Sequence, residues 1–156
     1  SVFESFSKSF VIDWINNNPS SAVSVASSSD LRNFFGKQII DIGIIGDHGF
    51  DLSRSMGHVL FNERRLDSLS VIREVFKSLF SSSVVQSALG DQLWLLNQRR
   101  HLFVHKRGVV DTGYLSKTAA LENKGDRLVL TSDDVKKHLV AVRDAIVAIG
   151  NVSTHT

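Results

Sequence analysis

The sequence predicts an all-α fold, a helical bundle of about five to six helices. Apolar residues recur at intervals of three and four along several stretches, which is the spacing of helices with one buried face. The stretch 125–131 is read as alternating, which is consistent with one short strand or an extended loop. We therefore expect at most one short strand or hairpin near 126–131.

Length and composition indicate a single globular domain over 1–156. The chain has 156 residues, of which 42% are hydrophobic and 22% charged, and domains commonly run to about 100–200 residues. This composition excludes disordered, collagen-like and disulfide-scaffold proteins. Because the first residue is Ser1 rather than Met, we expect an excised fragment of a longer protein or a tag remnant.

The N-terminal half is expected to form four helices. They run over 2–17, from Ser29 or Asp30 toward Ile45, over 52–61 and over 68–80. The Ser-, Ala- and Val-rich stretch 20–28 predicts a loop. Three glycines at intervals of three predict a turn before the third helix; they are Gly43, Gly46 and Gly49.

The C-terminal half is expected to hold the longest helix, over 84–106, weakened at Gly90 and ending before Gly108. The last helix is expected to begin with Ser132 as its N-cap, followed by two aspartates that favour the positive end of the helix dipole. Its apolar stripe is expected to face the core. The stripe consists of Val135, Leu139, Val142, Ile146 and Ile149.

Cysteine content and hydropathy restrict the class of protein. With no cysteine, the chain has no disulfide, no thiolate zinc site and no thiol nucleophile. The longest apolar run, Ile39–Ile45, is interrupted by Asp41 and is too short to span a bilayer. The first residues lack the layout of a signal peptide. We therefore expect a cytoplasmic protein with no membrane partner.

A basic cluster distinguishes the long helix, whereas the net charge of +2 by itself says little about partners. Its members lie within nine residues and are Arg99, Arg100, His101, His105, Lys106 and Arg107. On a helical wheel Arg99 falls in a gap between apolar faces, whereas Arg100 falls within the most apolar arc, with Asn97 beside it. Burying a guanidinium costs several kcal/mol unless it is paired or reaches a polar cavity. Arg100 is therefore the most unusual residue of this helix.

The segment from Arg100 to His105 resembles the signature of the HEPN superfamily, in which an arginine and a polar residue are followed by a histidine. Four residues separate Arg100 from His105, and the polar position is His101. The resemblance continues through Gly108-Val109-Val110-Asp111. It is specific over 94–118, extends to the helical layout of 56–150, and is absent from the first fifty residues.

This resemblance implies a metal-independent endoribonuclease that cleaves single-stranded RNA, without a cofactor, as a homodimer whose two motif helices line one cleft. Such domains act in toxin–antitoxin, phage-defence or RNA-processing settings, which implies an antitoxin or another regulatory partner. The spacing fits a dimer, because residues five apart on a helix point about 140° apart. Two chains around a symmetry axis would interleave two Arg100 and two His105.

The chemistry assigns each residue a role. His105 would act as general base or acid, because imidazole titrates near neutral pH. Arg100 would bind the phosphate and stabilise its transition-state charge. His101 or Asn97 would position the phosphate or orient His105. The RNA backbone would be tracked without sequence readout by Arg99, Lys106 and Arg107.

Three alternatives remain open at the level of the sequence. In the first, the domain is a catalytically silent HEPN-like module that serves dimerisation or binds a partner protein or nucleotide. Arg100 would instead form a structural ion pair, for example with Asp91. His101 and His105, spaced i and i+4, would ligate zinc, although no glutamate follows His101 and no third ligand is evident.

Overall fold

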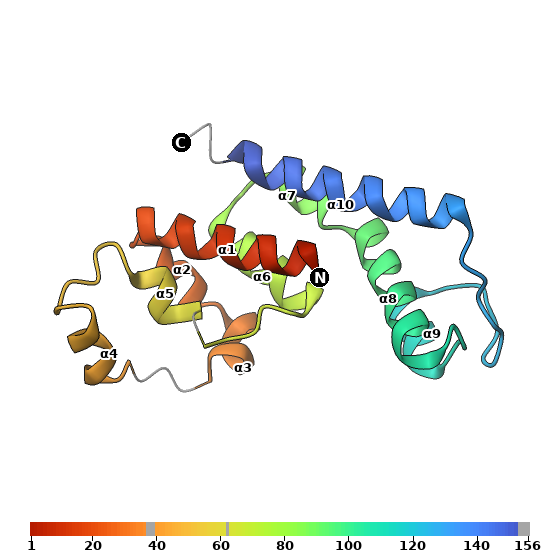
Figure 1. Cartoon of the computed structure of the whole chain (residues 1–156), viewed down its shortest axis with the longest axis horizontal. Coiled ribbons are helices and arrows are strands. Elements are labelled where there is room, and N and C mark those ends of the chain that lie inside the picture. Colours follow the sequence, from red (N-terminus) through yellow and green to blue (C-terminus); the bar gives the residue numbers. More distant parts are fainter. Residues whose placement is uncertain (37–39, 62, 153–156) are drawn as a thin grey trace. The chain divides into compact units, whose positions relative to one another are not determined.

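The structure, a computed structural model, describes residues 1–36, 40–61 and 63–152, and it is mostly helical (Figure 1). The expected all-α class is confirmed, with more and shorter helices than expected. The chain divides into an N-terminal unit, 1–82 with Val152, and a C-terminal unit, 83–151. The expectation of a single domain stays a prediction. In the described ranges, no helix combines the length and the apolar character needed to cross a membrane.

The N-terminal unit has a core of aliphatic and aromatic side chains from α1, α2, α3, α5 and α6. Its elements are α1 (Val2–Asn17), α2 (Ser21–Ala26), a 3₁₀ turn (Ser29–Leu31), α3 (Arg32–Phe35), α4 (Ile42–Asp47), α5 (Met56–Phe61) and α6 (Leu69–Leu79). The expected helices over 2–17 and 68–80 are confirmed. Ser1 begins α1 with a capping box to Glu4.

Three expectations for the N-terminal unit are wrong. The stretch 20–28 contains α2 rather than only a loop. The helix expected from Ser29 toward Ile45 ends at Gly36, whose φ of 63° a residue with a side chain rarely adopts; its part over 37–39 lies outside the described residues. Gly43 and Gly46 belong to α4, not to a turn.

Helices α1 and α5 approach each other closely at Gly57. A Cβ atom on Gly57 would lie 2.2 Å from the carbonyl oxygen of Ile12. The Gly57 amide donates a hydrogen bond of 2.8 Å to Oδ1 of Asn16, so an α1 side chain satisfies an amide in the first turn of α5. The absence of a side chain at Gly57 thus permits this helix contact.

The C-terminal unit consists of α7 (Ser83–Ala88), α8 (Asp91–Lys106), α9 (Thr112–Thr118) and α10 (Ser132–Val152), of which the last residue belongs to the N-terminal unit. The helix expected over 84–106 is divided at Gly90, which precedes α8 in an extended conformation. A Cβ there would lie 2.8 Å from the carbonyl oxygen of Ser87. With 21 residues, α10 is longer than α8, which has 16.

The end of α8 brings two distant segments together. Arg107 and Gly108 both have left-handed backbones, with φ of 53° and 80°. Leu128 then donates a backbone hydrogen bond of 2.9 Å to Gly108, and an isolated antiparallel bridge joins Val109 to Arg127. No longer strand occurs among the residues described. A Cβ on Gly108 would lie 3.0 Å from the Leu128 carbonyl oxygen. The absence of a side chain at Gly108 therefore permits the close approach of Leu128 to the end of α8.

Thr131, rather than the expected Ser132, caps α10. The Asp134 amide donates to the Thr131 hydroxyl oxygen at 3.1 Å, and the Thr131 amide donates to Oδ2 of Asp134 at 3.1 Å. The Thr131 hydroxyl also donates to Oδ2 at 2.6 Å. Asp134 is therefore the acidic member of a capping box. The hydrogen bond from the Thr131 hydroxyl is the main cause that lowers the pKa of Asp134.

Candidate functional site

All but one of the expected site residues lie on α8, and the remaining one, Arg107, follows it directly. Five of them are exposed, namely Arg100, His101, His105, Lys106 and Arg107, whereas Asn97 and Arg99 are partly buried. The expected environments of the two arginines are thus reversed. Arg99, which was expected in a solvent gap, is partly buried. Arg100, which was expected among apolar residues, is exposed next to those residues.

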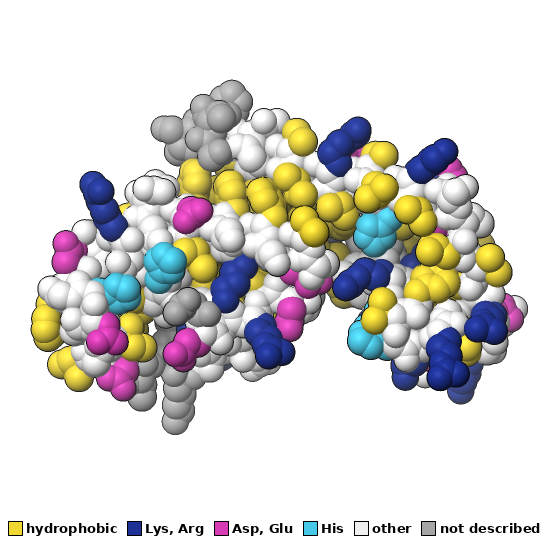
Figure 2. All heavy atoms as spheres, in the orientation of Figure 1, with side chains coloured by type: hydrophobic (Ala, Val, Ile, Leu, Met, Phe, Trp, Pro, Cys, Tyr) yellow, Lys and Arg dark blue, Asp and Glu magenta, His cyan; other side chains and the backbone are white. Residues whose placement is uncertain are grey.

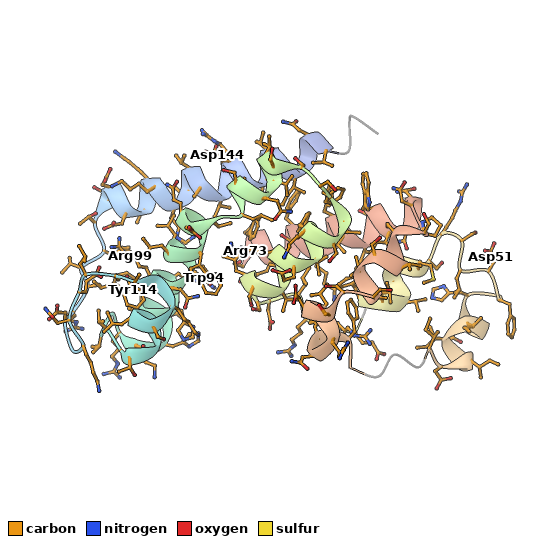
Figure 3. All side chains as sticks on the ribbon, turned by 180° about the vertical axis from the view of Figure 1, so that it is seen from behind. Asp51, Arg73, Trp94, Arg99, Tyr114 and Asp144 are labelled. Atoms are coloured by element: carbon orange, nitrogen blue, oxygen red, sulfur yellow. The ribbon has the colours of Figure 1, made fainter. Side chains whose placement is uncertain are left out.

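Arg99 is the centre of a network that links α8 to three other segments of the C-terminal unit; Figure 3 labels Arg99 and one of its partners, Tyr114. Its guanidinium lies 3.2 Å from the Glu122 carboxylate, 3.4 Å from the Asp134 carboxylate and 3.4 Å from the Tyr114 hydroxyl. The hydrogen bond with Tyr114 is the largest cause that raises the pKa of Arg99. Within one chain Arg99 therefore ties α8 to α9, to the loop after it and to the start of α10.

Helix α9, which the sequence analysis did not anticipate, explains this position of Arg99. Leu102, Val110 and Tyr114 form a buried cluster that Leu95 packs against, so α9 covers one apolar side of α8. The Trp94 indole adds a hydrogen bond of 2.9 Å to the Lys117 carbonyl. A sequence signal for α9 exists in Asp111, whose carboxylate caps it through the Tyr114 amide at 2.8 Å.

The apolar arc around Arg100 instead opens onto a groove of about 520 Å³, which we call the α8–α10 groove. Its walls are α8 with Leu96, Arg100, Phe103 and Val104, the segment 128–130, and α10 with Val135, His138 and Leu139. In Figure 2, hydrophobic side chains, a histidine and basic side chains stand together on α8 and α10.

The groove corrects the expected packing of α10. Val135 and Leu139, expected in the core, are 42% and 65% exposed. Ile149 of the expected stripe is buried, and the other buried positions of α10 are Ala141, Ala145 and Ala148. The buried apolar residues of α10 therefore lie from Ala141 onward, whereas Val135 and Leu139, nearer the N-terminus of the helix, line the open groove.

His138 is a groove residue that the sequence analysis missed. It is partly buried and lines the same groove as Arg100. Burial, and secondly the positive charge of Arg100, lower the pKa of His138 and so favour its neutral imidazole. Its place in the apolar stripe, three residues after Val135, is the signal that was available.

The two motif histidines form a separate pair. The ring centroids of His101 and His105 are 4.7 Å apart and both residues are exposed. Neither lines the groove that holds Arg100, so one chain does not bring Arg100 and His105 into one cavity. In the part of the chain that the structure describes, no group of three or more metal-binding side chains is placed to hold a metal ion.

Positive charge is concentrated in the C-terminal unit. It carries ten Lys and Arg against seven Asp and Glu, whereas the N-terminal unit carries eight against nine. Lys106 lies 3.9 Å from the Asp111 carboxylate in a solvent-exposed pair, which screens its charge only weakly. Guanidinium, imidazole and ammonium groups at one helix end are suited to binding phosphate and transferring protons.

Comparison with known proteins leaves the site to be interpreted from its own chemistry. No family model matches the chain, and neither a curated protein nor a solved structure matches it.

Proposed function

We propose that this chain is a metal-independent endoribonuclease that cleaves single-stranded RNA at a composite site formed by a homodimer. The observation that carries the proposal is the end of α8, where Arg100, His101 and His105 are all exposed next to Lys106 and Arg107. Their order along the chain is the one that resembles the HEPN signature. The net positive charge of the C-terminal unit supports an anionic substrate.

The reaction requires only proton transfer and charge stabilisation. One imidazole removes the proton from a ribose 2′-hydroxyl, and the 2′-oxygen forms a bond to the adjacent phosphorus. The bond from phosphorus to the 5′-oxygen breaks, and an imidazolium gives that oxygen a proton. The products are a 2′,3′-cyclic phosphate and a 5′-hydroxyl. His105 carries proton transfer, His101 or Asn97 positions the phosphate, and Arg100 stabilises its charge.

The divergence of Arg100 and His105 supports a dimeric site. Within one chain Arg100 lines the α8–α10 groove and His105 does not. Around the axis of α8, Val104 lies between Arg100 and His105, and its side chain is 60% exposed. An apolar residue so exposed is suited to contact with a second copy of the chain. Two copies packed along α8 would each bring His105 toward the other copy's Arg100.

RNA contact and biological setting follow from the same proposal. Lys106 and Arg107 bind the RNA backbone, and Arg99 contributes through the position it gives α8. The activity belongs to a cytoplasmic toxin–antitoxin, phage-defence or RNA-processing system. An antitoxin or other regulatory protein restrains it.

The test is cleavage of a single-stranded RNA by the purified chain in excess EDTA. We expect the wild type to leave 2′,3′-cyclic phosphate ends and His105→Ala to lose at least 100-fold in rate, because general acid–base catalysis contributes about 10²–10⁴-fold. His58→Ala is the matched control, since His58 is also exposed but lies on α5. Fragment ends are identified by mass spectrometry.

A second candidate is a catalytically silent module that binds a partner protein or nucleotide. The open apolar α8–α10 groove favours it, because contiguous exposed apolar surface commonly marks an interaction site. If folded, dimeric wild type leaves the RNA intact, this second function replaces the first. Cleavage that EDTA abolishes would instead indicate a histidine-ligated metal enzyme.

A further inference from the structure

The histidine that shares a cavity with Arg100 is His138 of α10, not a histidine of the motif. We propose that the α8–α10 groove binds one nucleotide of the RNA, with a phosphate held between Arg100 and His138 and the base on the apolar wall. The choice of a nucleotide as ligand rests on the proposed function. The anion site itself rests on the groove.

The dimensions and lining of the groove fit a ligand of this size. Its volume of about 520 Å³ lies within the range of about 300–1,000 Å³ typical of small-molecule sites. Such sites have mainly apolar walls and a few polar groups that fix orientation. Here Phe103, Val135 and Leu139 form apolar wall, and the ring of Phe103 supplies an aromatic surface for a base.

The charges that face the groove favour an anion. Helix α8 contributes the guanidinium groups of Arg99 and Arg100, and α10 contributes the Asp134 carboxylate and His138. The third wall, 128–130, is Leu-Val-Leu and carries no charge. Asp134 already accepts hydrogen bonds from Thr131 and Arg99. Among the side chains that line the groove, two are thus positively charged and one is negatively charged. Arg99 is also paired with Glu122 outside the groove, and His138 adds a positive charge when protonated.

Phosphate binding would change the protonation of His138. In the free protein burial and Arg100 favour the neutral imidazole. A phosphate anion between the two side chains would favour the imidazolium, so the pKa of His138 must rise when the ligand binds. By linkage, affinity for the phosphate rises as the pH falls through the pKa of the complex. An apolar ligand in the same groove would not raise this pKa.

The experiment follows the imidazole NMR signals of the full chain during pH titrations with a 3′-nucleoside monophosphate, inorganic phosphate or decanoate. We expect the nucleotide to raise the pKa of His138 and to shift the methyl signals of Val135 and Leu139. Inorganic phosphate should need at least tenfold higher concentration for the same shift, because it lacks a base. His138→Gln and Arg100→Gln should each weaken nucleotide binding at least tenfold.

Matched variants keep the result independent of folding. Arg143→Gln removes a cation from α10 outside the groove and should bind as the wild type does. Leu139→Glu places a carboxylate on the groove wall and should abolish binding, whereas Val147→Glu should not. Both positions are exposed on α10, at 65% and 52%, so both variants should keep the wild-type circular dichroism.

Two results would overturn the proposal. One is an unchanged pKa of His138 at a nucleotide concentration that saturates other signals. The other is tighter binding of decanoate than of the nucleotide, which would assign the groove to apolar anions. Nucleotide binding without RNA cleavage would refute only the proposed ribonuclease, and cleavage without nucleotide binding in the groove would refute only this subsite.

Discussion

Arg99 and Arg100 are adjacent, yet the turn of about 100° per residue on a helix directs them to different tasks. Arg99 joins Tyr114, Glu122 and Asp134. Arg100 faces an open groove together with His138. Arg99 thus stabilises the part of the C-terminal unit in which Arg100 lines the groove. The effect of a substitution on the proposed RNA cleavage therefore has to be assigned to structure or to chemistry at each arginine separately.

We expect Arg99→Gln to lower the free energy of unfolding by about 1 kcal/mol, since it removes several partly exposed hydrogen bonds and ion pairs. Arg143→Gln is the control, because its pair with Asp144 is local and largely exposed; it should change stability by less than about 0.5 kcal/mol. Urea unfolding followed by circular dichroism measures both. Equal effects would show that the Arg99 network does not stabilise the unit.

The sequence located the cluster on α8 but assigned the two arginines to the wrong environments. The partners of Arg99 lie 15, 23 and 35 positions further along the chain, so no local pattern shows them. His138 was missed for a related reason. One wall of its groove is the segment 128–130, which a backbone hydrogen bond from Leu128 to Gly108 joins to the end of α8. The local pattern of 126–131 does not show which helix that segment contacts.

At the scale of the elements, glycine determines where helices end and where they meet. Gly36 ends α3, Gly90 separates α7 from α8, and Gly57 lets α5 approach α1. The sequence pattern alone does not distinguish Gly57 from the other residues of its helix. Only the 2.2 Å from its ideal Cβ position to the Ile12 carbonyl oxygen shows that a side chain would not fit.

Gly57→Ala should therefore destabilise the N-terminal unit by about 1–3 kcal/mol, the usual cost of overpacking, because the obstacle is backbone rather than a flexible side chain. Gly46→Ala is the matched control, since the nearest atom to its Cβ would be the end of the Phe50 ring at 4.0 Å. That change should stabilise the chain by about 0.5 kcal/mol. Thermal unfolding should move in opposite directions for the two variants.

Helix prediction succeeded where local signals were complete. Helix α1 has a capping box at Ser1 and Glu4, and α6 buries Leu69, Ile72, Val75 and Phe76 at regular helical spacing. It failed for α2 and α9, which have six and seven residues. A helix that short gives too few turns for a periodic pattern, and tertiary contacts such as the Trp94 indole stabilise it.

At the scale of the whole molecule, charge is divided unequally between the two units. The C-terminal unit has an excess of three basic residues, and the N-terminal unit has one more acidic than basic residue. The proposed RNA substrate is therefore expected to bind to the C-terminal unit alone. The release of counterions from RNA makes this expectation measurable.

The double variant Lys106→Gln with Arg107→Gln should reduce the slope of log K against log salt by about 1.4, because each lost contact to single-stranded RNA contributes about 0.7. The control variant Arg54→Gln with Arg65→Gln removes two exposed cations from the N-terminal unit and should leave the slope unchanged. Binding to an uncleavable 2′-O-methyl RNA is measured between 50 and 200 mM salt. Equal loss of slope in both variants would place the RNA on both units.

The chain has two tryptophans, and each unit contains one of them. Trp14 stacks with Phe10 and meets Phe80 edge-on in the N-terminal unit. Trp94 belongs to α8, where its indole is bonded to the end of α9. Each unit thus has its own intrinsic fluorophore. In a Trp14→Phe chain the remaining emission reports the attachment of α9 to α8, the helix that bears Arg100 and His105, with no external label.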